Sequence, residues 1–433
     1  MKPITTGLIA LSLSVVSINA SAKVDFDKVF NDSTLRLDYI YSGNANNQYV
    51  SLQAMHASEG WAGRRINLDC LPLFGNGQLT MTDAASGDTI YRTSFSDLFL
   101  EWLETDEAQT TTRAMQATQN VPMPKQKANI SVTLFNHRNE PTTTLTHVVD
   151  PKDILIKRNK PTNITPHRYI LKSGSPKEKI DVAILAEGYT EADMDSFYVH
   201  AGKAVESILS HSPFKDMADR FNFVAVASPS KDSGVSIPRF NDWKSTAFSS
   251  HFSTFYSNRY LTTSNVYDIH NVLAGIPYEH LIILANTPEY GGGGIYNAYT
   301  LTTARNPMFW PVVTHEFGHS FGGLADEYFY EHQDTMNDTY PLDVEPWEPN
   351  VTTMIDFDSK WKDMIKKGTP IPTPTEKAEK YGVGAYEGAA YSTKGIYRPV
   401  DHCRMRDNAT KDFCPVCARS IERIINFYTV DDK

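Results

Sequence analysis

The chain has 433 residues and a formal net charge of −10, with 41% hydrophobic and 21% charged residues. A chain of this length divides into two or three domains, each able to bury a hydrophobic core. The composition is that of a folded globular protein and excludes an intrinsically disordered one. The acidic balance argues against nucleic acid as a partner, because nucleic-acid binding requires basic patches.

The first 22 residues have the pattern of an export signal. Lys2 supplies the positive charge, residues 7–18 form a short apolar stretch, and Ala20-Ser21-Ala22 fits the small-x-small cleavage pattern. We therefore predict a signal peptide over residues 1–22, cleavage after Ala22, and a secreted or periplasmic mature protein. No later segment approaches the ~20 apolar residues of a membrane-spanning helix, so we expect no membrane span after signal removal.

Short alternating strands and polar turns fill the next region. Residues 35–41, 78–82, 89–93 and 130–134 alternate between apolar and polar positions, residues 83–87 have hairpin-turn chemistry, and a short helix is possible near 98–103. This pattern predicts a β-sandwich over residues 23–160. The region contains no cluster of His, Cys or carboxylate residues, so we expect an accessory role such as substrate recruitment or shielding of a catalytic domain.

Residues 161–433 have a different pattern. A polar, proline-rich connector over 151–179 is followed by near-continuous apolar runs at 180–186, 223–227 and 281–285, which are typical of buried strands. Apolar residues at helical spacing predict a helix over 194–209. Strands that alternate with helices indicate a layered α/β or α+β domain.

The stretch from Thr314 to Tyr328 carries the chemistry. It contains His-Glu-x-x-His, and on a helix His315 and His319 lie on one face, one turn apart, where both can ligate one Zn²⁺. Glu316 can act as general base toward a water held by the metal. The competing interpretation is a chance match on a buried helix, because the five-residue pattern is loose.

A catalytic zinc site needs a third protein ligand. Gly322 and Gly323 break the helix, and the carboxylates of Asp326 and Glu327 follow at once. A turn at the glycines can return either carboxylate to the metal.

Two further segments flank this stretch. Residues 290–297, Tyr-Gly-Gly-Gly-Gly-Ile-Tyr-Asn, lack the Lys-Ser/Thr pair of a phosphate loop. They are interpreted either as a mobile turn or as a border of the cleft, where glycines let a substrate backbone approach closely. Residues 331–391 are long and irregular, as functional covers or disordered loops are, and Trp347 and Trp361 suggest that parts of this segment pack down.

Three of the four cysteines lie close together near the C-terminus. In an exported protein they favour a disulfide from Cys403 to Cys414 or Cys417. The Cys-x-x-Cys pair could instead be half of a structural zinc site or a redox pair, and Cys70 has no assigned partner. An amphipathic helix begins near Pro415. Met405 lies just before it and is the candidate for a Met-turn, the apolar floor beneath the metal in metzincin-type peptidases.

Taken together, these blocks resemble the immunoglobulin-A peptidase family of bacterial zinc metallopeptidases. The matching segments span nearly the whole mature chain: residues 315–328, 187–190, 232–234, 290–297, 387–388 and the Cys403…Met405…Cys417 tail. The resemblance implies an α+β multidomain protein, in which an N-terminal β-sandwich precedes a metzincin-like domain with a mixed sheet, an active-site helix and a C-terminal helix.

The resemblance also implies the site residues. His315 and His319 would ligate zinc and Glu316 would be the catalytic base. In the common metzincin spacing the third ligand falls on Ala325, which cannot bind metal, so we predict Asp326, one residue beyond, with Glu327 as its competitor. The expected function is zinc-dependent endopeptidase activity on a protein or peptide substrate; the alternative is an exported binding protein with a structural zinc site. A tyrosine or an arginine would stabilise the oxyanion, and the sequence indicates neither which one nor the oligomeric state.

Overall fold

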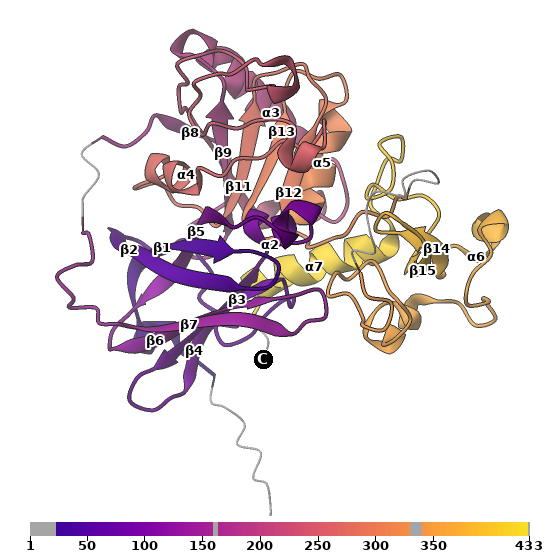
Figure 1. The fold of residues 1–433 in the computed structure, drawn as a ribbon, viewed down its shortest axis with the longest axis horizontal. Coiled ribbons are helices and arrows are strands. Elements are labelled where there is room, and N and C mark those ends of the chain that lie inside the picture. Colours follow the sequence, from indigo (N-terminus) through magenta and orange to yellow (C-terminus); the bar gives the residue numbers. More distant parts are fainter. Residues whose placement is uncertain (1–22, 159–162, 330–339, 432–433) are drawn as a thin grey trace, which may run out of the picture.

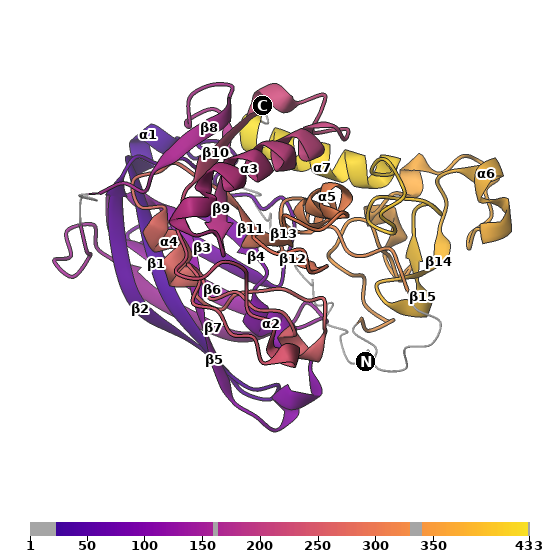
Figure 2. The same cartoon turned by 90° about the horizontal axis from the view of Figure 1, so that it is seen from above.

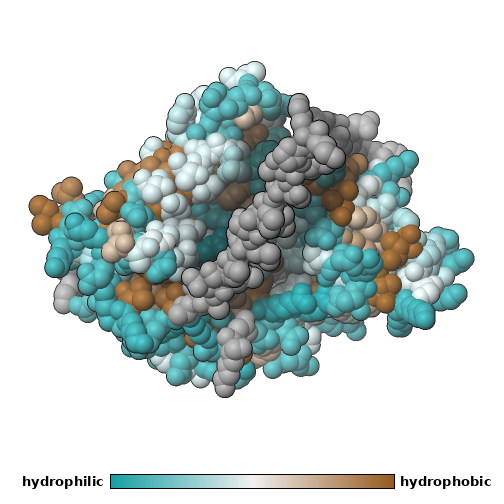
Figure 3. Space-filling view, turned by 90° about the horizontal axis from the view of Figure 1, so that it is seen from below, coloured by the Kyte–Doolittle hydropathy of each residue, from teal (hydrophilic) through white to brown (hydrophobic). Residues whose placement is uncertain are grey.

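The computed structural model describes residues 23–158, 163–329 and 340–431. The predicted signal peptide lies outside the described residues. No helix in the described ranges is long and apolar enough to cross a membrane. The face shown in Figure 3 is largely hydrophilic, with hydrophobic residues in separate small patches.

Two antiparallel sheets form the N-terminal region, as the alternating strands predict. One has the order β2-β1-β5 and the other β4-β3-β6-β7. Their elements are α1 (Phe26–Val29), β1 (Phe30–Gly43), β2 (Gln48–Glu59), β3 (Gly77–Asp83), β4 (Thr89–Phe95), α2 (Leu98–Trp102), β5 (Arg113–Pro124), β6 (Ala128–Phe135) and β7 (Pro141–Val149).

A six-stranded mixed sheet forms the second region, in the order β12-β13-β11-β9-β10-β8. The four central strands are parallel, and the edge strands β12 and β8 are antiparallel to their neighbours. Its elements are β8 (His167–Lys172), β9 (Ile180–Glu187), α3 (Met194–Leu209), β10 (Phe221–Val226), α4 (Val266–Val272), β11 (His280–Ala285), β12 (Gly292–Ile295), β13 (Tyr299–Thr303) and α5 (Phe309–Ser320).

The residues after α5 form the C-terminal part of the fold. An irregular segment with α6 (Ala378–Tyr381) leads into the hairpin of β14 (Tyr386–Ala389) and β15 (Ser392–Arg398), and α7 (Pro415–Thr429) ends the fold. In Figures 1 and 2 the irregular segment and the hairpin form a lobe beside α5, and α7 runs from that lobe toward the N-terminal sheets. Trp361 is fully buried, which confirms that part of the segment packs down.

Hydrophobic burial explains how these layers pack. Strand β9 is buried at every position, because side chains on both of its faces enter a core. Val182 and Ile184 pack with α3, α5 and α7, whereas Ala183 and Leu185 belong to a core that is continuous with the two N-terminal sheets. The N-terminal sheets therefore cover one face of the mixed sheet, and α3, α5 and α7 cover the other.

The sequence-based elements are mostly confirmed, with one error in the connector. The predicted buried strands correspond to β9, β10 and β11, and the predicted helices to α2, α3 and α7. The segment 151–179 is not only a linker, because His167–Lys172 pairs antiparallel with β10 as strand β8. Its residues are half-exposed or exposed, so this edge strand lacks the apolar signal of its neighbours.

Candidate metal centre

Helix α5 places the two imidazoles side by side. His315 Nε2 and His319 Nε2 are 3.1 Å apart. The opposite ring nitrogens are both held by the backbone: His315 Nδ1 lies 3.0 Å from the carbonyl oxygen of Arg404, and His319 Nδ1 lies 2.6 Å from that of Leu324. Because each Nδ1–H donates to a carbonyl, both Nε2 lone pairs face the same point, as in metal-binding histidine pairs.

The helix ends in a glycine turn that reverses the chain. The Gly323 N–H donates to the carbonyl of His319, and the Leu324 N–H donates to that of Gly318. Gly323 has a φ of +59°, in the left-handed region where a glycine commonly ends a helix. The turn returns the following residues to the face of α5 that carries the imidazoles.

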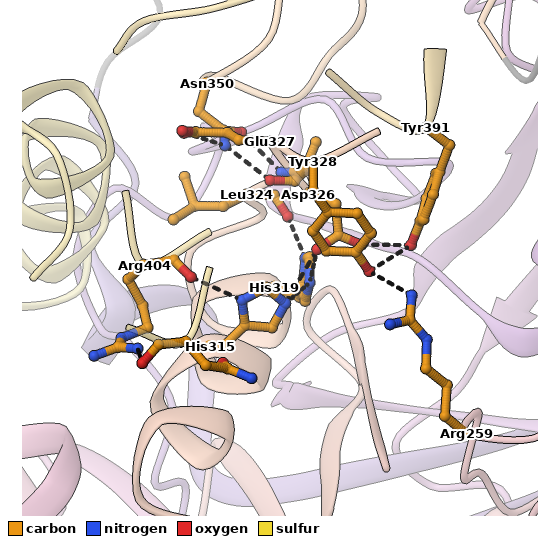
Figure 4. Close-up of polar contacts among 12 residues, drawn as sticks. Arg259, His315, His319, Leu324, Asp326, Glu327, Tyr328, Asn350, Tyr391 and Arg404 are labelled. Carbon is orange, nitrogen blue, oxygen red and sulfur yellow. Dashed lines mark hydrogen bonds and ion pairs between the residues drawn. The ribbon is translucent and has the colours of Figure 1, made fainter. Parts of the chain in front are cut away.

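Asp326 is the carboxylate that reaches the imidazoles. Its Oδ1 lies 3.0 Å from His315 Nε2 and 3.2 Å from His319 Nε2. Glu327 points the other way, where its Oε1 accepts hydrogen bonds from Asn350 Nδ2 at 3.0 Å and Cys417 Sγ at 3.0 Å. Figure 4 shows this divergence of neighbouring side chains.

The three facing atoms fit a metal ion. Ligand atoms about 2.0–2.1 Å from a tetrahedral Zn²⁺ are separated by about 3.3 Å. The three pairwise distances among His315 Nε2, His319 Nε2 and Asp326 Oδ1 are 3.0, 3.1 and 3.2 Å. Asp326 Oδ1 is buried and faces the two Nε2 atoms, as expected of an atom oriented toward a shared cation.

Glu316 lies beside this triplet and forms a compact group with the two histidines, whose potential ligand atoms are all within 4.8 Å of one another. Burial raises the pKa of the Glu316 carboxyl above its usual range, although the charges of the two imidazoles oppose that shift. Burial alone would lower the pKa of His319, but the Asp326 carboxylate outweighs it and raises that pKa to about 9. A cation bound between these groups would compete with a proton on His319.

Two tyrosines and an arginine extend the site, and sequence reasoning did not single them out. The Tyr391 hydroxyl donates to Asp326 Oδ2 and lies 3.2 Å from the Tyr328 hydroxyl. Tyr328 stacks on His315 with an interplanar angle of 20°, and Arg259 Nη2 donates to its hydroxyl at 3.1 Å. The hydrogen bonds among them join residues up to 69 positions apart, so no local spacing in the sequence could have revealed them (Figure 4).

Met405 lies beneath α5. Its side chain is fully buried, and a Cβ added at Gly318 would come within 2.7 Å of its Sδ. The Met405 carbonyl accepts the Glu327 N–H at 2.9 Å. The turn around Met405 thus touches both the helix and the segment that carries Asp326, as the Met-turn prediction requires.

The glycine run forms a paired strand, not a turn. Gly292–Ile295 is strand β12, paired with β13. A Cβ added at Gly292 or Gly294 would crowd Glu316 and His319 of α5, and one at Gly293 would crowd Tyr260 on the other face. The mobile-turn interpretation is therefore wrong. The run does border the site, but its glycines accommodate α5 and the segment around Tyr260.

The predicted disulfide is absent from the structure. All four cysteines are free, and Cys70 is exposed. Cys403 Sγ lies 3.7 Å from Cys417 Sγ, well beyond the bond length of about 2.05 Å. The prediction of a Cys403 disulfide is therefore wrong. Instead, the thiols of Cys403, Cys414 and Cys417 converge with the Glu327 carboxylate, and no two of them form a disulfide.

Two imidazoles one helical turn apart, with an adjacent buried carboxylate, are the arrangement of metal-dependent peptidases. Family comparison agrees: the model for the IgA peptidase M64 family matches residues 169–382 and 375–425, and the model for the M64 N-terminus matches residues 25–146. The chain therefore belongs to the M64 (IgA) peptidase family, and it is a peptidase of a metallopeptidase family. No curated protein matches the chain.

Proposed function

We propose that this protein is an exported zinc-dependent endopeptidase with His315, His319 and Asp326 as its metal ligands and Glu316 as its general base. The observation that carries the proposal is the triangle of three ligand atoms separated by 3.0–3.2 Å. These distances suit Zn²⁺, and the imidazole and carboxylate donors are typical of catalytic zinc. Three protein ligands leave a position open for water or substrate.

The catalytic role of each group follows from its chemistry. When bound, Zn²⁺ would supply Lewis acidity, which acidifies a water molecule and polarises the scissile carbonyl. Glu316 accepts the proton of the attacking water and passes it to the leaving amine. Burial favours this role, because the raised pKa brings the Glu316 carboxyl closer to the working pH.

Tyr328 and Arg259 are our candidates for stabilising the oxyanion. The Tyr328 ring stacks on His315, and its hydroxyl receives an N–H from Arg259. Burial raises the pKa of Glu316, and the Arg259 charge is among the influences that oppose this rise, which places the guanidinium within electrostatic range of the base. A hydroxyl polarised by a guanidinium is a suitable donor to a developing negative charge.

The wider assignments belong to the same proposal. The mature protein would comprise a β-sandwich accessory domain over 23–160 and a metzincin-like catalytic domain over 161–433, secreted or periplasmic after cleavage behind Ala22. The shared core of the two antiparallel sheets supports the sandwich, and the position of Met405 beneath α5 supports the metzincin-like arrangement. The substrate class is protein or peptide; the family description alone does not make immunoglobulin A its substrate.

The test compares the wild-type protein with Glu316→Gln on a diverse peptide library. The variant should retain its zinc while the rate of cleavage falls by about 10²–10⁴-fold, the usual contribution of a general base. Glu191→Gln, at an exposed glutamate near the start of α3, serves as the matched control and should cleave normally. Unchanged cleavage by Glu316→Gln would refute the assignment of the base, and cleavage that persists after complete zinc removal would refute the zinc mechanism.

A further inference from the structure

A second cluster of metal-binding side chains lies behind the histidine site. Glu327, Cys403, Cys414 and Cys417 each bring one ligand atom to within 4.8 Å of the others, and all four residues are buried. Glu327, Cys403 and Cys417 have no solvent exposure, and Cys414 is 4% exposed. The residues come from three separate segments, so the fold assembles the cluster: the turn after α5, the loop after β15, and the start of α7.

The Glu327 carboxylate has too few partners for its surroundings. Within the described part of the chain, its Oε2 is buried without a hydrogen bond, and its Oε1 accepts from Asn350 Nδ2 and Cys417 Sγ. No ion pair found among the described residues includes Glu327. A buried carboxylate is costly unless a cation or several donors compensate it, so the atoms around it indicate a missing positive charge.

The sulfur separation distinguishes a metal site from a disulfide. Two thiolates about 2.3 Å from a tetrahedral Zn²⁺ are separated by about 3.8 Å. Cys403 Sγ and Cys417 Sγ are 3.7 Å apart, which matches an edge of that tetrahedron. The carboxylate oxygen of Glu327 lies 3.0 Å from Cys417 Sγ, so a fourth ligand is already in place.

The backbone around the cluster favours anionic sulfur. Cys414 is the N-cap of α7, whose first-turn N–H groups and helix dipole stabilise negative charge. The Cys417 N–H donates to Cys414 Sγ at 3.4 Å, and the Cys414 N–H donates to Cys403 Sγ at 3.3 Å. N–H groups that donate to cysteine sulfurs are the outer-shell contacts that orient metal-bound thiolates.

We propose that Glu327, Cys403, Cys414 and Cys417 form a closed, structural zinc site, separate from the histidine site. Soft sulfur ligands favour zinc over magnesium or calcium, and four buried protein ligands leave no open position for substrate. The site is structural, and its metal holds the turn after α5 against the loop after β15 and the start of α7.

The site supports the catalytic one through two backbone contacts. The Arg404 carbonyl, next to Cys403, holds His315 Nδ1, and the Met405 carbonyl accepts the N–H of Glu327, next to Asp326. A metal that binds Glu327 to Cys403 therefore fixes the two segments that orient His315 and Asp326.

The first experiment counts metal and thiols in the mature protein, purified without reductant or chelator. We expect two zinc ions per chain in the wild type and one in the His315→Ala/His319→Ala variant, because that variant leaves the cysteine cluster intact. After denaturation with chelator but no reductant, alkylation followed by mass spectrometry should label all four cysteines. One zinc in the wild type and none in the double variant, or only two labelled cysteines, would overturn the proposal.

The second experiment identifies the ligands. Co²⁺ exchanged into the His315→Ala/His319→Ala variant should give a near-ultraviolet thiolate-to-cobalt charge-transfer band. Adding Cys414→Ser should abolish or shift this band, whereas Cys70→Ser, at the exposed cysteine, should leave it unchanged. Absence of the band in the folded double variant would overturn the assignment. Because the double variant lacks the histidine site, these readouts do not depend on peptidase activity.

Discussion

Gly292→Ala should impair catalysis without removing the metal. A Cβ at Gly292 would lie 2.8 Å from Glu316 Oε1 and 3.0 Å from its Cγ and Cδ. Gly292 does not occupy the left-handed region, so alanine meets no backbone penalty there. The strain falls on the end of the Glu316 side chain, which must move by roughly 0.6 Å to restore ordinary van der Waals contact.

The size of the effect follows from that displacement. A misplacement of about 1 Å in a catalytic group costs about 10²-fold, so we expect kcat/KM to fall roughly 10- to 100-fold, about 1.4–2.7 kcal/mol in transition-state stabilisation. Zinc content should remain at the wild-type level, because the three atoms nearest to the new methyl group all belong to Glu316 and none to a proposed metal ligand.

The assay measures kcat/KM on one fluorogenic peptide together with zinc content and Tm. Gly202→Ala is the matched control, since a Cβ there meets nothing within 4 Å in helix α3; it should keep full activity and gain up to about 1 kcal/mol in stability. Gly294→Ala differs from both, because its Cβ would overlap the Glu316 backbone carbonyl and destabilise the packing of β12 on α5. Wild-type kcat/KM in a folded Gly292→Ala variant would refute the placement of the base beside β12.

Two further predictions concern a ligand partner and a buried acid. Tyr391→Phe removes the hydroxyl that donates to Asp326 and should weaken zinc binding about 10- to 100-fold in a chelator competition. Tyr49→Phe, at an exposed tyrosine, should bind zinc as the wild type does. Equal zinc affinities of Tyr391→Phe and the wild type would contradict a role of Tyr391 in positioning Asp326. Burial raises the pKa of Asp181 to about 6 although Asn222 donates to it, so its contribution to stability is present below the unfolded-state pKa and is lost as pH rises through about 6. Asp181→Asn should therefore increase the free energy of unfolding relative to wild type by up to about 3 kcal/mol at neutral pH and by little near pH 4; denaturant titrations showing an equal difference at both pH values would contradict this.

Local periodicity explains why the centre of the site was predictable from sequence. A helix of 3.6 residues per turn necessarily places His315 and His319 on one face, and the structure separates their Nε2 atoms by only 3.1 Å. The prediction of Asp326 rested on the spacing that the family resemblance implies, shifted by one residue and with Glu327 as its competitor, and the structure places Asp326 Oδ1 3.0 Å from His315 Nε2. The structure adds the physical reason: the helical hydrogen bonding ends at the left-handed Gly323, and the chain then reverses so that Asp326 faces the imidazoles.

The rest of the site depends on contacts between distant segments. Arg259 and Tyr391 approach the histidine site from two loops through Tyr328 and Asp326. Asn350 binds the neighbouring Glu327 from a third loop. The composition of these loops does not distinguish them from other loops. The mobile-turn interpretation of residues 290–297 was wrong for a different reason. Consecutive glycines indicate that side chains are excluded there, but not which neighbouring group occupies the space. Here it is helix α5 on one face and Tyr260 on the other.

The adjacency of Asp326 and Glu327 links the two proposed metal sites. In an extended segment, neighbouring side chains point to opposite sides, and here Asp326 faces the imidazoles while Glu327 faces the three thiols. A shift of one residue would exchange the two carboxylates and deprive both clusters of a correctly placed ligand. In the proposed arrangement, the spacing after His319 is thus coupled to the cysteines about 80 residues later, because the residue that would fill the third position of one site fixes its neighbour as the fourth ligand of the other.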